Sequence, residues 1–118
     1  MGIKDILQKK SFDFALEVVK CYKVLAYEKK ELVLSKQLLR SGTAIGALIR
    51  EAEHAQSRAD FIHKLSISLK ESNETDYWID LLVASDYINN ETHKVLKEGN
   101  LELLKLLTSI IKNTKINS

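Results

Sequence analysis

Residues 70–78 read KESNETDYW and lie near the end of a segment, Ser35–Tyr87, that contains no proline. Two carboxylates, Glu71 and Glu74, are followed by the sole tryptophan, Trp78, at steps of three and four residues. These steps place the three side chains on one stripe of an α-helix that also carries apolar residues. The pattern predicts a long helix with a partly polar contact face. It indicates an architecture much better than it indicates an activity.

The composition favours an all-helical domain. The chain has 118 residues, the usual size of one domain, and 45% of them are hydrophobic, enough to supply a core. Proline is absent and only four glycines occur. Because proline breaks helices and marks the turns of β proteins, its absence favours helices. We therefore predict one domain, residues 1–118, with an all-α fold.

Four amphipathic segments follow one another along the chain. Apolar residues that recur every three or four positions predict helices over residues 11–29, 32–56, 58–87 and 90–114. Helices of this length that are joined by short connections pack as antiparallel neighbours. The sequence therefore predicts an antiparallel, up-and-down four-helix bundle.

Polar residues at the boundaries give the expected helix starts. Ser11, Ser57 and Asn89 have side chains of the kind that cap a helix N-terminus, and Asp60 follows Ser57 at the spacing of a capping box. Gly99 falls inside the last helix and is expected to kink or break it. The inward stripe of the first helix is expected to contain Phe12, Ala15, Val19, Tyr22 and Ala26.

Two glycines in the second predicted helix indicate a close contact between helices. Gly42 and Gly46 are one turn apart and therefore lie on the same face. Each costs about 1 kcal/mol relative to alanine in a helix interior. We expect a neighbouring helix to approach this face closely, which would compensate for the cost. Ala44 and Ala47 would help it to do so.

Acidic residues on apolar stripes indicate a structural polar network. A carboxylate on a buried face must be hydrogen-bonded or paired, because burying it alone is costly. Hydroxyl groups, tyrosines or basic residues of another subunit are the expected partners. A general acid–base pair is the rival interpretation, but no nucleophile accompanies it. The predicted network consists of Glu51, Glu71, Glu74 and Trp78.

A metal site is a weaker hypothesis. Glu51 and His54 form a Glu-x-x-His spacing, which places both side chains on one helical face. Di-iron bundles use this motif twice and add a glutamate from each of the other two helices. Here the motif occurs once, and Glu71 and Glu74 supply no histidine. The ligand set is incomplete, so we predict no metal, no cofactor and no catalytic residue. A small metal-dependent enzyme using these four residues is the alternative.

The charge distribution suggests a nucleic-acid hypothesis. The net charge is only +2, but residues 1–40 carry nine Lys or Arg against five Asp or Glu, and residues 41–86 carry four against eight. If the first and last helices are neighbours, their lysines could form a strip that binds phosphates. The alternative is an ordinary solvated face. The candidate contacts with nucleic acid are Lys20, Lys23, Lys30, Lys105, Lys112 and Lys115.

The remaining sequence features concern location. Cys21 is the only cysteine, so no internal disulfide can form, and it is expected to be a small core residue in a reducing compartment. Residues 1–10 lack the apolar core of a signal peptide. No stretch approaches the roughly 20 apolar residues of a membrane span. We predict a cytoplasmic protein without a membrane partner.

Several of these motifs together resemble the four-helix bundle protein family, also called the 23S rRNA intervening-sequence protein family. The resemblance covers about Phe12 to Lys112. It departs from the usual family pattern at Ala44, where serine is common, and at Leu48, where asparagine is common. The residues that carry it are Gln37–Ala47, Glu51-Ala52, Asp60-Phe61, Lys70-Glu71, Glu74, Tyr77-Trp78 and Leu81-Leu82.

The resemblance implies an antiparallel bundle that assembles as a homopentamer. It also implies similarity to the accessory variability determinant of diversity-generating retroelements, a basic pentameric barrel that binds nucleic acid and a reverse transcriptase. Together with the residue patterns, it leads to the hypothesis of a non-enzymatic, self-associating scaffold or adaptor that binds RNA or a ribonucleoprotein. A module that captures a partner helix is a further alternative.

Overall fold

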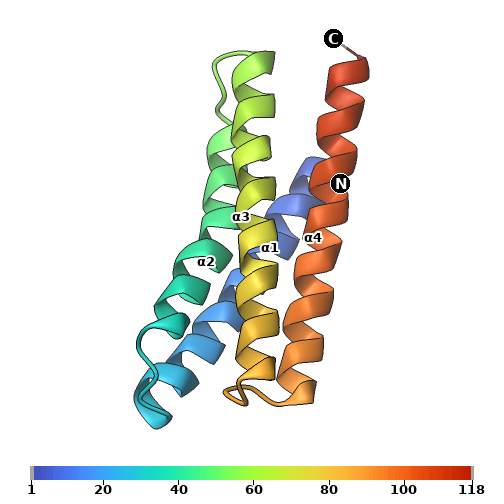
Figure 1. Ribbon diagram of the computed structural model, residues 1–118. Helices are drawn as coiled ribbons and strands as arrows, with labels where there is room; N and C mark the ends of the chain where they lie inside the picture. Colours follow the sequence, from blue (N-terminus) through green and yellow to red (C-terminus); the bar gives the residue numbers. More distant parts are fainter. Residues whose placement is uncertain (1, 118) are drawn as a thin grey trace.

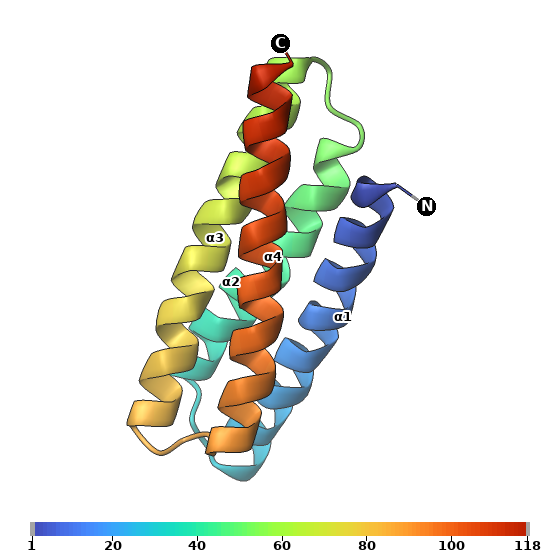
Figure 2. The same cartoon turned by 90° about the vertical axis from the view of Figure 1, so that its right-hand side faces the viewer.

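The computed structural model describes residues 2–117, which form four long helices and one short π-helix. The long helices are α1 (Ile3–Lys23), α2 (Leu34–Ala52), α3 (Arg58–Ala84) and α4 (Asn90–Ile116), and the π-helix η1 (Val24–Glu28) directly follows α1. Each long helix packs against the next, and α1 also packs against α4 (Figure 1). Figure 2 shows that successive helices run in opposite directions. The predicted all-α, up-and-down bundle is confirmed.

The bundle is elongated, with extents of 47 × 23 × 22 Å. Its long axis follows the helices, and the short connections lie at its two ends (Figure 1). Within residues 2–117, none of the helices combines the length and the apolar character that crossing a membrane requires.

Two of the predicted helix starts are confirmed with their caps. The Ser57 hydroxyl accepts a hydrogen bond from the Asp60 backbone N–H at 3.0 Å, so α3 begins at Arg58. The Asn89 side chain accepts one from the Thr92 N–H at 2.8 Å, and α4 begins at the next residue. Both caps satisfy backbone donors that the first helical turn leaves free.

The predicted start of the first helix is wrong. Helix α1 begins at Ile3, and Ser11 is a buried residue in its middle, where its hydroxyl donates to the Gln8 carbonyl at 3.0 Å. The physical reason is Leu7, which is buried and lies two turns before Phe14 on the same face. The core contact of Leu7 therefore extends α1 back to Ile3, through residues that precede the predicted helix.

The inward face of α1 also differs from the prediction. The side chains that α1 and η1 bury include Leu7, Phe14, Val18, Cys21 and Leu25, whereas Phe12 is 52% exposed. Of the expected stripe only Ala26 is buried. Both sets of residues recur at helical spacing, so α1 carries two apolar stripes. The bundle buries one of them fully, whereas Ala15, Val19 and Tyr22 of the other are half-buried.

The connection between α1 and α2 is held by a buried carboxylate. Helix α1 widens into η1, where the Lys29 N–H donates to the Val24 carbonyl five residues earlier at 3.1 Å. Glu31 then turns its side chain onto the start of α2 and accepts from three backbone N–H groups at 2.7–3.1 Å. A carboxylate is stabilised there by the helix dipole as well as by the hydrogen bonds. This cap sets the start of α2 at Leu34.

Polar side chains join α2, α3 and α4 inside the core. Ser72 of α3 donates to the Asn100 side chain of α4 at 2.8 Å, and the Asn100 amide donates back to the Ser72 carbonyl at 2.9 Å. Thr75 donates to Ser41 of α2 at 2.9 Å. Because these groups are fully buried, sliding one helix along another would leave them unsatisfied. Helix α4 continues past Gly99 without the predicted break, and a Cβ atom there would lie 3.0 Å from Cδ1 of Phe14, so α1 packs closely against this glycine.

The two glycines of α2 lie against α1. A Cβ atom at Gly42 would be 2.8 Å from Cγ2 of Val18, and one at Gly46 would be 3.2 Å from the Ser11 hydroxyl. The first distance is far shorter than van der Waals contact, so Gly42 allows the backbone of α2 to approach a β-branched side chain. Valine cannot move aside easily, because its χ1 angle is restricted in a helix.

Replacing Gly42 tests this contact. Overpacking a core costs about 1–3 kcal/mol, whereas alanine improves helix propensity by about 1 kcal/mol. We expect Gly42→Ala to lower the free energy of unfolding measured in urea. In a Val18→Ala background the same change should cost less, because the clashing methyl groups are gone. Equal costs in both backgrounds would contradict the proposed contact.

Candidate interaction surfaces

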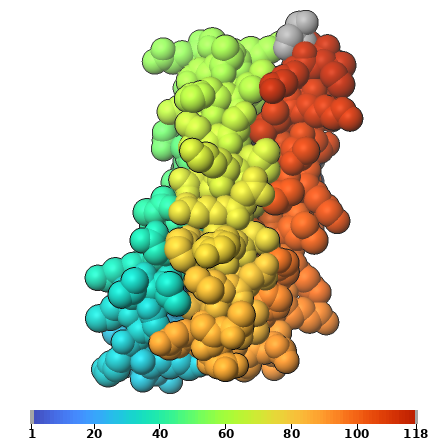
Figure 3. All heavy atoms as spheres, viewed as in Figure 1, coloured from blue at the N-terminus to red at the C-terminus, as the bar shows by residue number. Residues whose placement is uncertain are grey.

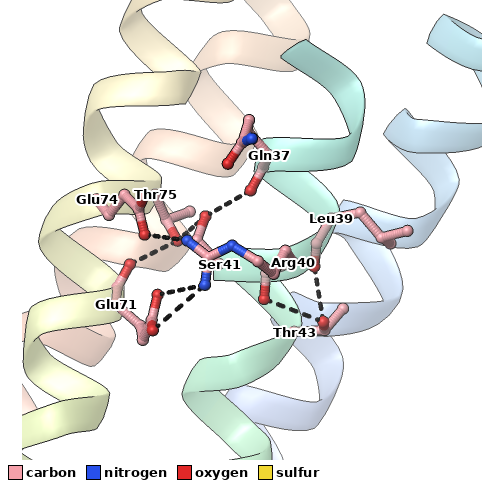
Figure 4. Close-up of polar contacts among 8 residues, drawn as sticks. All are labelled: Gln37, Leu39, Arg40, Ser41, Thr43, Glu71, Glu74 and Thr75. Atoms are coloured by element: carbon pink, nitrogen blue, oxygen red, sulfur yellow. Dashed lines mark hydrogen bonds and ion pairs between the residues drawn. The ribbon is translucent and has the colours of Figure 1, made fainter. Parts of the chain in front are cut away.

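Arg40 of α2 binds both acidic residues of the KESNETDYW segment. Its guanidinium lies 3.3 Å from Glu71, whose side chain is 19% exposed, and it also pairs with Glu74 (Figure 4). This hydrogen bond from Arg40 is the main reason why the pKa of Glu74 is lowered. The partner of the two carboxylates is therefore a basic residue of the same chain. Its position on the contact face of α2 makes the cluster a link between α2 and α3.

Trp78 extends the link along α3. Its ring packs against the hydrophobic core, and among residues 2–117 its buried indole nitrogen has no acceptor at hydrogen-bonding distance. The indole N–H makes no hydrogen bond to the Glu74 carboxylate that meets the usual geometry. Of the groups that lower the pKa of Glu74, Trp78 contributes least. Tyr77 stands next to it with the ring centroids 5.1 Å apart and nearly edge to face. The predicted inward stripe is thus half-buried between α2 and α3, while the fully buried face of α3 combines Leu65, Ile79 and Leu82 with Ser68, Ser72 and Thr75.

The fourth member of the predicted network is separate from the other three. Glu51 is exposed and pairs with Lys64 of α3 at 3.1 Å. His54, which shares its predicted metal motif, lies beyond the end of α2 and is exposed. Within residues 2–117 no group of three or more His, Cys, Asp or Glu side chains is placed to hold a metal ion. Glu51 and His54 are therefore not assembled with Glu71 and Glu74 into a ligand set.

A second charged cluster, between α3 and α4, was missed from the sequence. Lys97 of α4 binds Asp76 at 3.0 Å and Asp80 at 2.9 Å, and His93 contacts Asp80 at 2.9 Å. Hydrogen bonds from His93 and then Lys97 lower the pKa of Asp80, and the same aspartates raise the pKa of Lys97. The signal was present in the i, i+4 spacing of the two aspartates. The spacing alone does not identify Lys97 as the partner, because the sequence does not say which helix packs against that face of α3.

The predicted lysine strip is divided between the two ends of the bundle. Lys20 and Lys23 lie at the end of α1, near the start of α4, and Lys30 lies in the connection that follows η1. Lys112 and Lys115 lie near the opposite end of α4, with Lys105 between (Figure 2). The structure therefore places the six lysines in two groups, and only the α4 group follows one helix.

Exposed apolar side chains are concentrated in the first third of the chain, and Phe12 and Leu16 are neighbours among them on the outward side of α1. Within residues 2–117, seven of the eleven exposed large hydrophobic side chains lie between residues 3 and 33. Beside Phe12, a groove of about 470 Å³ runs between α1 and α2 and is lined mostly by apolar atoms. The seven residues are Ile3, Phe12, Leu16, Val24, Tyr27, Leu32 and Val33.

Cys21 is buried in the contact between α1 and α4, as expected for a core residue. Burial raises the pKa of its thiol to about 11, although Lys29 opposes this effect. Because the thiolate is the reactive form, this thiol reacts slowly at neutral pH.

These features define a class of protein: a four-helix bundle in which charged and hydroxyl side chains connect the helices. The match to a family model over residues 4–109 identifies that class further. The chain belongs to the 23S rRNA-intervening sequence protein family, as the resemblance indicated.

The chain is also similar to a solved structure. It is 54% identical to a protein of unknown function from the S23 ribosomal protein family of Bacteroides thetaiotaomicron VPI-5482, with a TM-score of 0.92. The similarity covers 94% of this chain and 99% of that one. No curated protein matches the chain.

The carboxylate clusters predict that acid weakens the fold. The pKa of Glu74 lies below its ordinary value of 4.5, and that of Asp80 lies below 3.8. Groups with lowered pKa values stabilise the folded state above their ordinary pKa, and this stabilisation is lost as pH falls through the lowered value. We expect the free energy of unfolding to decrease below about pH 4.5, and Glu74→Gln to reduce that decrease.

Glu102→Gln is the matched control, because Glu102 is exposed and pairs with Lys10 on another side of the bundle. Urea denaturation at a series of pH values measures both variants. An unchanged acid dependence in Glu74→Gln would show that the Arg40 pair does not stabilise the fold.

Proposed function

We propose that this protein is a non-enzymatic scaffold that associates with copies of itself through the outward side of α1 and the adjoining groove on α2. The observation that carries the proposal is the second apolar stripe of α1. A helix that is apolar on two sides is normally buried on both. Burying one Leu or Phe side chain stabilises a contact by about 1.5–3 kcal/mol. Phe12 and Leu16, 52% and 54% exposed, therefore favour a protein partner.

A second copy is the favoured partner because the chain itself offers surfaces of opposite charge. Helix α1 contains five basic and three acidic residues, whereas α3 contains three basic and five acidic residues. Unlike patches on one molecule form a head-to-tail contact, which closes into a ring when the rotation permits. The ring of five copies implied by the family resemblance is the expected assembly.

Light scattering on the purified protein tests the proposal. We expect a mass several times the 13.4 kDa of one chain, approaching five copies, at micromolar concentration. Phe12→Glu should lower the mass towards 13.4 kDa, because it places a charge in the contact. Leu101→Glu is the control, since Leu101 is 44% exposed on α4, outside the proposed surface.

Circular dichroism would verify that both variants stay helical. A wild-type protein that remains monomeric across micromolar concentrations would refute self-association and favour capture of a different partner helix. A wild-type oligomer that Phe12→Glu does not disturb would show that the contact lies elsewhere.

The lysines of α4 support a second proposal, that this helix contacts RNA through its outward face. Lys105 and Lys112 are seven residues apart and therefore share one face. Both are exposed, and neither makes an ion pair within the described residues 2–117. Free ammonium groups on one face can bind phosphates, as electrostatic RNA binding requires.

Fluorescence anisotropy with a labelled RNA measures this binding. We expect the affinity to fall steeply as salt rises, and Lys105→Gln with Lys112→Gln to weaken binding and flatten the salt dependence. Lys70→Gln removes one exposed lysine from α3 and should change neither. Absence of binding at low salt would refute the proposal.

A further inference from the structure

The groove between α1 and α2 is shaped to accept a large side chain. Small residues make up part of its lining, among them Ser11 and Ala15 of α1 and Gly46 and Ala47 of α2. Phe12 stands at its rim, with the Arg50 guanidinium 5.9 Å from the centre of the ring. The volume of about 470 Å³ and the apolar lining are typical of a site that takes an aromatic or aliphatic group.

Tyr77 of α3 has the size and exposure that a side chain needs to fill this groove. Tyr77 is 60% exposed, and within residues 2–117 it is the only exposed large hydrophobic side chain of α3. Its ring is fixed by the edge-to-face contact with Trp78, which is itself packed on the core. Figure 3 shows α3 in the middle of one face, between α2 and α4. A tyrosine that is held outward in this way loses little entropy on contact.

The charges around Tyr77 complement those of the groove. Each of the two clusters on α3 holds two carboxylates with one cation, Arg40 in the first and Lys97 in the second. The first cluster therefore keeps one negative charge, and Tyr77 lies between Asp76 and Asp80, the two carboxylates of the second. Arg50 at the groove makes no ion pair within the described residues, and both helices that form the groove carry more basic than acidic residues.

We infer that Tyr77 of one copy inserts into the α1–α2 groove of a second copy. This inference rests on the proposed self-association and assigns the two surfaces that meet. Tyrosine is among the residues that contribute most to protein interfaces, particularly when it fills a pocket. The carboxylates beside Tyr77 would lie near Arg50, which orients the contact and steers association. Because the tyrosine face and the groove are different surfaces, the contact is head to tail.

Substitution of Tyr77 tests the contact. We expect Tyr77→Ala to raise the dissociation constant about tenfold or more, and Tyr77→Phe to leave it nearly unchanged, because the ring fills the groove. Leu101→Ala removes a similarly exposed apolar side chain from α4 and is the control. Sedimentation velocity measures all three variants. An unchanged dissociation constant in Tyr77→Ala would overturn the inference.

Cross-linking tests the head-to-tail geometry without removing the tyrosine. Asn73 is exposed one turn before Tyr77, and Ala47 is exposed at the groove. With a short bismaleimide, the double variant Asn73→Cys with Ala47→Cys should give a ladder of cross-linked chains, and each single variant should stay uncross-linked. Cys21 does not interfere, because its thiol is buried. The wild-type protein verifies this.

The outcomes separate the inference from the proposed function. A cross-linked dimer from Ala47→Cys alone would mean that two grooves face each other, which overturns the role of Tyr77. An oligomer in which the double variant gives no ladder overturns the inference but leaves self-association intact. A monomeric wild-type protein overturns both.

Discussion

Helix α1 imposes the main constraint on this molecule, because it carries more apolar side chains than one bundle can bury. Leu7, Phe14 and Val18 face the core, and Phe12 and Leu16 point outward. A large exposed apolar surface on one element marks an interaction site far more often than scattered exposed residues do. The glycines of α2 belong to the same arrangement, since they bring α2 close to α1 and leave a shallow groove beside the outward stripe.

The other three helices are held together in a different way. Their contacts combine an apolar core with buried hydroxyl and amide groups, of which Asn100 and Ser72 form a reciprocal pair. Buried polar pairs add little net stability, because forming them only replaces hydrogen bonds to water, but breaking them is costly. They therefore select one register of the helices. The Arg40 and Lys97 clusters, near the surface on the two sides of α3, favour the same register of the helices.

The sequence predicted α3 and α4 better than α1, and the reason is local chemistry. Ser57 and Asn89 are caps that act through the next few residues, so their effect can be read from neighbours in the chain. The face of α1 that points into the core is the apolar stripe that meets α2 and α4. Two stripes of equal spacing cannot be told apart without knowing where those helices lie. Ser11 looked like a cap for the same reason, since its burial depends on Gly46 of another helix.

The polar sites show the same limit. The spacing of Glu71 and Glu74 indicated a paired acidic stripe, but only the packing of α2 on α3 identifies Arg40 as the partner. Glu51 has a similar sequence pattern but does not join this cluster, because it lies further along α2 than Arg40 and pairs with Lys64. The six lysines were predicted to form one strip because they share helix faces. The distance between the lysines of α1 and those of α4 depends on how far α4 extends along the bundle.

The central claim, that the outward stripe of α1 is covered by another copy in solution, can be tested most directly by carbene footprinting at increasing protein concentration. The method reports the accessibility of individual side chains, and Leu101 of α4 provides an internal reference. The account predicts that labelling of Phe12 and Leu16 falls with concentration while labelling of Leu101 stays constant. Equal labelling of all three residues at every concentration would contradict it.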